Sequence, residues 1–186
     1  HRWQSPQGAI DSWSTRLTLQ PAQNWSGQYS YAFLHSPEQL DPNADQHRMT
    51  ASIMYNRPLS GQNNWISSFV WGRTRTGAYN LVENSYLFES LLRFDSRNNA
   101  FTRIENADRT TELLLDGNPI PPNFTEQSAG RVQAYTFGYD RDIPLVPHLS
   151  SALGAQFTAY SPSAQLEPAY GAHPTGFNIF LRLRPF

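Results

Sequence analysis

The sequence predicts an all-β protein, an antiparallel up-and-down transmembrane β-barrel with about nine strands, in a single domain over residues 1–186. Apolar and polar side chains alternate over long segments, which is the period of a β-strand with one apolar face. The connections between these segments alternate between short and long. The composition, with 14 Pro, 11 Gly and 13% aromatic residues, is typical of strands and turns.

The first four predicted strands are recognised by apolar side chains, many of them aromatic, at every second position. In the first, Trp13, Leu17 and Leu19 share one face and Arg16 lies on the other. Lengths of about 9 to 11 residues suit a tilted strand that crosses a hydrocarbon core. These strands are Ser12–Gln20, Trp25–Leu34, His47–Asn56 and Trp65–Arg73.

The next strands combine the same alternation with charged residues on the polar face. Phe88 and Leu92 oppose Glu89 and Arg93 in the fifth segment, whereas the shorter sixth segment is recognised by a charged face. The predicted strands are Asn84–Phe94, Ala100–Asn106, Arg131–Arg141, Ser151–Tyr160 and Gly176–Phe186.

The connections alternate in length along the chain, as in outer-membrane barrels, where short turns face the periplasm and long loops face outward. The short or intermediate connections are Pro21–Asn24, Pro58–Asn64, Asp95–Asn99 and Asp142–Leu149. The longer ones are His35–Gln46, Thr74–Glu83, Ala107–Gly130 and Ser161–Thr175.

This alternation predicts that the chain is the C-terminal part of a larger barrel. If Phe186 lies in the periplasm, counting back places the segment before the first strand outside. A complete bacterial single-chain barrel has an even number of strands and both termini in the periplasm. We therefore expect that the sheet does not close on itself, and that further N-terminal strands or an oligomeric partner complete it.

The chain resembles the C-terminal half of an uncharacterised family of porin-like outer-membrane β-barrels from Gram-negative bacteria. The similar stretches are IDSWSTRLTL at 10–19, YSYAFLHSPEQLDP at 29–42, HRMTASIMYNRP at 47–58, residues 65–72 and FTAYSPSAQLEPAYGAHPTGFNIFLRLRPF at 157–186. The resemblance implies location in the bacterial outer membrane and contact with its lipid. It also implies that Phe186 is a terminal signal read by the barrel assembly machinery. Counting back from Phe186, Arg184 and Arg182 stand where that signal usually has apolar residues.

The two strand faces predict two sets of residues. Charged side chains of the polar faces are predicted to line the lumen: Arg16, Arg48, Glu89, Arg93, Arg103, Glu105 and Arg182. Apolar side chains are predicted to face the membrane: Trp13, Leu17, Leu19, Tyr29, Tyr31, Ile53, Phe88, Leu92, Leu153, Phe157, Leu181 and Leu183.

Two interpretations of the charged set stay open. It either lines a path for solutes or forms a ladder of cross-strand ion pairs that neutralises the interior. All 14 basic residues are Arg, which stays charged in a medium of low dielectric constant. Five guanidiniums opposed by Glu89 and Glu105 predict a lumen that prefers anions.

The favoured function is a porin-like channel for passive or facilitated passage of small solutes. One alternative is a structural or adhesive barrel that binds a partner through long loops such as Ala107–Gly130. Another is a soluble ligand-binding barrel, which would turn its apolar faces inward.

Other classes find little support. The net charge of −1 gives no field for nucleic acid, and Cys is absent. His35, Glu38, Asp41, Asp45 and His47 gather in one segment without a recognised ligand spacing, so we expect no metal and no other cofactor. No nucleophile motif surrounds His148 or His173, so we expect no enzyme.

Overall fold

The protein forms one antiparallel sheet of nine strands, each paired with its neighbours in the sequence, in the order β1 to β9. The computed structural model describes residues 11–37, 44–77, 80–110, 128–143 and 149–185. The predicted all-β, up-and-down architecture is confirmed. Within the described residues, no helix has the length and apolar character needed to cross a bilayer.

The strands are 10 to 15 residues long, a length that suffices to cross a bilayer. They are β1 Trp13–Ala22, β2 Trp25–Leu34, β3 Gln46–Pro58, β4 Asn64–Thr76, β5 Leu81–Phe94, β6 Asn98–Thr110, β7 Ser128–Asp142, β8 Leu149–Pro162 and β9 Thr175–Pro185. The connection between β8 and β9 contains a one-turn helix, α1 Glu167–Tyr170, which the alternation did not predict.

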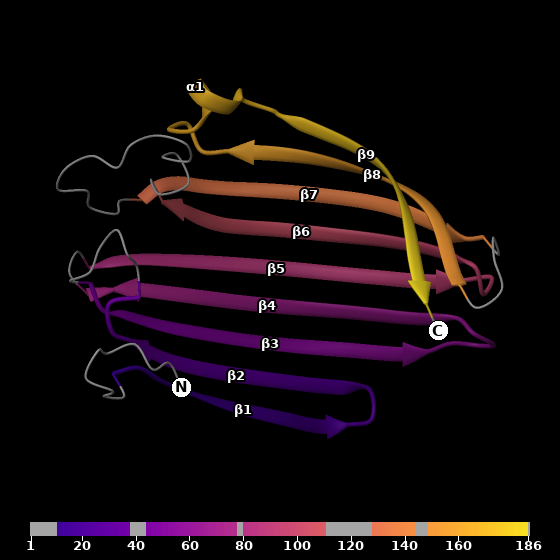
Figure 1. Ribbon diagram of the computed structural model, residues 1–186, viewed down its shortest axis with the longest axis horizontal. Coiled ribbons are helices and arrows are strands. Elements are labelled where there is room, and N and C mark those ends of the chain that lie inside the picture. The colour runs from indigo at the N-terminus through magenta and orange to yellow at the C-terminus, as the bar shows by residue number, and fades with distance from the viewer. Residues whose placement is uncertain (1–10, 38–43, 78–79, 111–127, 144–148, 186) are drawn as a thin grey trace.

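The strands run between two opposite ends of the sheet (Figure 1). Strands β2, β4, β6 and β8 terminate at the end that also carries α1, which we call the long-connection end. Strands β1, β3, β5, β7 and β9 terminate at the other end, which we call the short-turn end.

Several predicted boundaries were wrong because the strands extend beyond the alternating segments. The predicted long connection Thr74–Glu83 is reduced to residues 77–80, and the segment Ala107–Gly130 contributes residues to both β6 and β7. Residues 111–127, the rest of that segment, lie outside the described part of the chain. Backbone pairing does not depend on hydropathy, so a ladder continues past the point where apolar side chains end.

The sheet is open. In the described residues β1 pairs with β2 alone and β9 pairs with β8 alone, so each outer strand presents an edge without a partner. The expectation that this chain does not close into a barrel by itself is confirmed for the described sheet.

The sheet has a polar face and an apolar face, and the polar face is the concave one. Side chains buried at the floor of the concave side include Asn99, Asp140 and Thr158, at 3%, 3% and 6% exposure. A soluble barrel that binds apolar ligands would need the reverse arrangement, with its apolar face inside.

Two glycines let aromatic rings lie flat across this concave face. A Cβ at Gly138 would lie 2.1 Å from Cζ of Phe101, and one at Gly154 would lie 2.5 Å from Cζ of Phe180. The two rings are in contact, with centroids 6.3 Å apart. Phe101 of β6 and Phe180 of β9 therefore span the intervening strands β7 and β8.

We expect Gly154→Ala to lower the free energy of unfolding by about 1–3 kcal/mol, because the added methyl group overpacks the site. The new Cβ would also lie 2.7 Å from Cβ of Asp140, an atom near the backbone that cannot swing away. The measurement is a urea titration of the full-length protein folded into lipid vesicles.

Gly72→Ala is the matched control for this substitution. Its Cβ would lie 4.0 Å from the nearest atom, an ordinary contact with Cβ of Ser85. Equal stability of the two variants would contradict the packing that we describe at Gly154.

Candidate functional site

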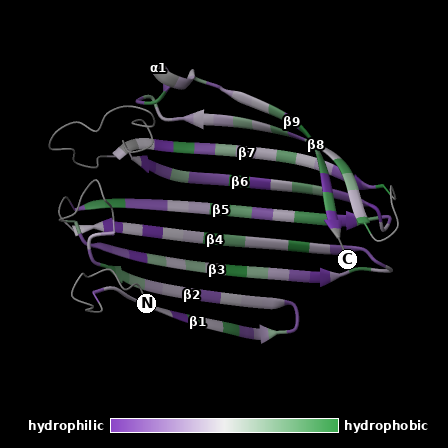
Figure 2. Cartoon of the chain, in the orientation of Figure 1, coloured by the Kyte–Doolittle hydropathy of each residue, from purple (hydrophilic) through white to green (hydrophobic). Residues whose placement is uncertain are grey.

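The register of the ladders assigns every described strand residue to one of the two faces, because directly paired residues lie on the same side of a sheet. All charged residues that were predicted to line the lumen lie on the polar face. All residues that were predicted to face the membrane lie on the apolar face. Their contact with a lumen or with lipid remains a prediction. The alternation of polar and apolar bands along the strands is visible in Figure 2.

The apolar face carries an uninterrupted band without charges. On β3 the band runs between His47 and Arg57, and on β7 between Arg131 and Arg141. Ten residues at about 3.3 Å each span about 33 Å along a strand. With a strand tilt of about 35–45°, the band is about 25 Å tall, the height of the apolar band in outer-membrane barrels.

Large apolar side chains within this band are exposed. Ile179 is 71% exposed, Phe177 65% and Phe137 58%. The face also carries Trp13, Trp25, Trp65 and Tyr86, several of them near strand ends. An apolar surface of this extent is not stable in water, so it requires a covering.

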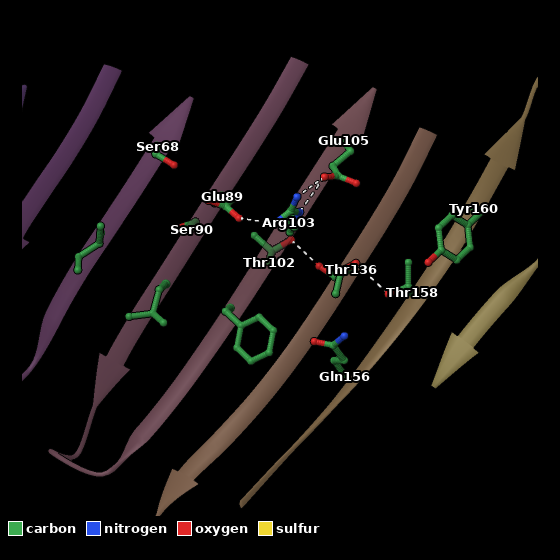
Figure 3. Close-up of a pocket in the computed structure, with 13 residues that line it drawn as sticks. Ser68, Glu89, Ser90, Thr102, Arg103, Glu105, Thr136, Gln156, Thr158 and Tyr160 are labelled. Carbon is green, nitrogen blue, oxygen red and sulfur yellow. Dashed lines mark hydrogen bonds and ion pairs between the residues drawn. The ribbon is translucent and has the colours of Figure 1, made fainter. Parts of the chain in front are cut away.

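On the polar face, Arg103 lies between two carboxylates (Figure 3). Its Nη1 is 3.1 Å from Oε1 of Glu89, the residue directly opposite on β5. Its Nε donates to Oε1 of Glu105, two positions along β6, at 2.9 Å. The three side chains are 30–48% exposed, so each pair contributes about 1 kcal/mol or less.

Hydroxyl groups continue this row across the sheet. Thr136 of β7 and Thr158 of β8 are joined by a hydrogen bond of 2.8 Å between their Oγ1 atoms. Together with Gln156 and the apolar residues Ile66, Leu91 and Phe101, this row borders a hollow of about 650 Å³ (Figure 3).

A second charged network lies nearer the short-turn end. Arg182 of β9 donates through Nη2 to Asp140 at 2.9 Å and to Asp142 at 3.1 Å. Arg93 of β5 donates to Asp142 at 2.8 Å, and Nδ2 of Asn99 donates to Asp140 at 2.7 Å. The network therefore connects β5, β6, β7 and β9.

Small residues on β8 make this connection possible. Arg182 pairs directly with Ala152, and Asp140 pairs directly with Gly154. Neither β8 residue has a side chain long enough to block the guanidinium, so Arg182 crosses β8 and reaches β7.

The expectation that only Glu89 and Glu105 oppose the arginines was wrong. Asp140 and Asp142 lie on the same face and bind two of them. Asp140 could have been found from the sequence, because the alternation of its predicted strand places it on the face opposite Phe137 and Tyr139. Asp142 could not, because the predicted strand ended at Arg141.

The remaining predicted lumen residues, Arg16 and Arg48, border a separate hollow of about 450 Å³ over β1, β2 and β3. Nε of Arg16 donates to Oγ of Ser30 at 3.0 Å. Arg48 donates through Nε and Nη2 to Oε1 of Gln46, at 3.0 and 2.7 Å.

The described side chains of the segment considered for a metal do not come together around one point. Nδ1 of His35 is 2.7 Å from Asp45, whereas Nδ1 of His47 is 2.7 Å from the hydroxyl of Tyr31. Glu38 and Asp41 lie outside the described residues, as do His148 and Phe186. Among the residues that are described, no group of three or more potential metal ligands occurs.

We expect Arg182→Gln to lower the free energy of unfolding by about 3 kcal/mol, because it leaves the buried carboxylate of Asp140 without its cation. Urea unfolding in vesicles measures the change. Arg184→Gln is the control on the same strand and face, where the side chain is exposed, and we expect an effect within about 0.5 kcal/mol. Similar losses in both variants would show that the network does not stabilise β9.

We expect Ile53→Arg to destabilise the protein in a bilayer by about 2–4 kcal/mol, because Ile53 lies at the middle of the uncharged band. Ser52→Arg places the same charge one position away on the polar face, where we expect a much smaller effect. If Ser52→Arg costs as much as Ile53→Arg, the apolar face does not contact lipid.

The fold is similar to that of OccK11 (OpdR) from Pseudomonas aeruginosa, an outer-membrane porin. The match has a TM-score of 0.62 at 14% sequence identity and covers 90% of this chain. It covers 46% of the OccK11 chain, so the protein described here spans about half the length of that structure. No protein-family model matches the sequence, and no curated protein matches it. At this identity the similarity shows the fold: nine antiparallel strands that match part of a porin barrel.

Proposed function

We propose that this chain forms part of a porin-like barrel in the bacterial outer membrane, through which small solutes pass along the polar face. The observation that carries the proposal is the separation of charge between the two faces. One face is concave and carries hydrogen-bonded charged and hydroxyl groups, and the other carries an uncharged band about 25 Å tall. The similarity of the fold to OccK11 supports the same proposal.

The open edges of β1 and β9 require further strands. Lipid cannot hydrogen-bond the free N–H and C=O groups of an edge strand, so only a closed sheet is stable in a bilayer. We propose that strands N-terminal to this chain, or another chain, complete the barrel. Its other partners would be outer-membrane lipid and the barrel assembly machinery, the latter through Phe186.

The charges of the polar face suit a lumen with a moderate preference for anions. Arg93, Arg103 and Arg182 each bind a carboxylate, whereas Nε of Arg16 donates to the hydroxyl of Ser30. On the polar faces of the described strands, seven arginines face five carboxylates: Arg16, Arg48, Arg93, Arg103, Arg109, Arg182 and Arg184 against Glu83, Glu89, Glu105, Asp140 and Asp142. The excess positive charge is therefore smaller than the sequence predicts.

The polar face therefore has two regions: the charged networks on β5 to β9 and the hollow over β1 to β3. The networks on β5 to β9 hold strands together, and an ion attracted to them must compete with carboxylates already in place. The hollow that Arg16 and Arg48 border lies over β1, β2 and β3, apart from these networks, and Nε of Arg16 donates there to a hydroxyl. We propose that this region contributes most to ion preference.

We expect the full-length protein in planar bilayers to prefer anions at low salt, and the double variant Arg16→Gln/Arg48→Gln to lower the anion-to-cation permeability ratio by roughly two- to threefold. The difference should shrink as the Debye length falls from about 30 Å at 0.01 M salt to about 3 Å at 1 M. Reversal potentials across a salt gradient measure the ratio.

Glu89→Gln is the control of opposite sign, because it removes a negative charge from the same face. We expect it to raise the preference for anions. A channel that prefers cations, or the absence of conductance, would contradict the proposed role of the polar face.

A further inference from the structure

A group of basic side chains lies on the apolar face at the long-connection end. Arg73 and Arg75 of β4 share this face with His47 of β3, which pairs directly with Arg75. We call these three residues the basic rim. They lie just beyond the uncharged band, whose last aromatic pair at this position is Trp71 and Tyr86.

The two guanidiniums of the basic rim are exposed. Nη2 of Arg75 donates to the side-chain oxygen of Asn80 at 3.2 Å, a neutral partner. Two carboxylates near this end have partners. Asp108 is bound by Arg131 at 2.9 Å and also accepts from the backbone N–H of Asn84, and Asp45 lies 2.7 Å from Nδ1 of His35. Among the described residues, no carboxylate lies within ion-pair distance of Arg73 or Arg75.

Aromatic groups hold the third member in place. Nδ1 of His47 lies 2.7 Å from the hydroxyl of Tyr31, and the ring of Phe33 lies 5.3 Å from the imidazole. The rim therefore combines positive charge with aromatic rings that are typical of the boundary between hydrocarbon and head groups.

Among the described residues, the opposite border of the band has no comparable group. Its arginines on the apolar face, Arg57 of β3 and Arg141 of β7, stand on strands that are separated by β4, β5 and β6. Two positive charges close together on one strand are therefore a feature of the long-connection end.

We propose that the basic rim binds the phosphate of a lipid head group in the outer leaflet of the membrane. Guanidinium groups bind phosphate oxygens in a bidentate manner, and the acyl chains of the same lipid would extend along the apolar face below. The inference rests on the proposed function for its orientation, which places long connections outside and short turns in the periplasm.

The test compares lipids that differ in phosphate alone. The full-length protein is purified in a neutral detergent and titrated with lipid A, a phosphorylated glucosamine lipid, or with its dephosphorylated form. Native mass spectrometry counts the retained lipid. We expect lipid A to bind, its dephosphorylated form to bind much more weakly, and Arg73→Gln/Arg75→Gln to weaken lipid A binding by about tenfold or more.

The double variant Arg57→Gln/Arg141→Gln is the matched control, since it removes two arginines from the same face at the other border, and we expect it to retain lipid A. The single variants Arg73→Gln and Arg75→Gln, each with a smaller loss, replace the double variant if it does not fold. Inorganic phosphate alone should show no comparable binding, because a free anion lacks the acyl chains.

Unchanged lipid A binding by Arg73→Gln/Arg75→Gln would overturn the proposal, as would an equal loss in the control variant or equal binding of the dephosphorylated lipid. Equal binding of inorganic phosphate would also overturn the proposal, because this result would indicate a site for free anions. Single-channel conductance of the same variants separates the two proposals. Loss of lipid A binding with unchanged conductance supports the proposed role of the basic rim. A wild-type protein that binds lipid A but does not conduct contradicts the proposed channel function alone.

Discussion

The structure depends on the need to pair the backbone N–H and C=O groups of every strand, a need that is strongest in the proposed membrane setting. A strand satisfies this need only through its neighbours, so each of the nine strands is paired along nearly its whole length with the next one in the sequence. Sequential antiparallel pairing also requires only local connections, and it explains why β4 and β5 are joined by residues 77–80 alone. The same need makes the free edges of β1 and β9 the part of the structure that calls for a partner.

The two faces of the sheet differ in polarity, and in the proposed setting one face contacts lipid and the other water. The apolar face can carry exposed Ile, Leu and Phe because lipid covers them in the proposed setting. The polar face places seven guanidiniums on a concave surface, where Arg103 and Arg182 bind carboxylates. Arginine suits this task because it remains charged in surroundings of low dielectric constant and can bind two oxygens at once.

Small side chains decide how far an interaction reaches across the sheet. Gly138 and Gly154 leave room for the rings of Phe101 and Phe180, and Ala152 leaves room for Arg182 to pass over β8. The short side chains of β7 and β8 therefore couple β9 to strands that it does not pair with. This coupling holds the last strand of the chain to the sheet through side chains as well as through its single ladder.

The sequence by itself determined the strand order, the antiparallel topology and the face on which each proposed lumen and membrane residue lies. It could do so because alternation with a period of two is a local property of the chain, which can be read without knowing which strands pair. Tertiary structure alone decided where the strands end, because backbone pairing continues into polar segments such as Asn106–Thr110 of β6. It also decided the partners of each charge. Whether Arg182 binds Asp140 depends on the register of three strands and on the small residues of the one between them, and no segment of the sequence contains that information.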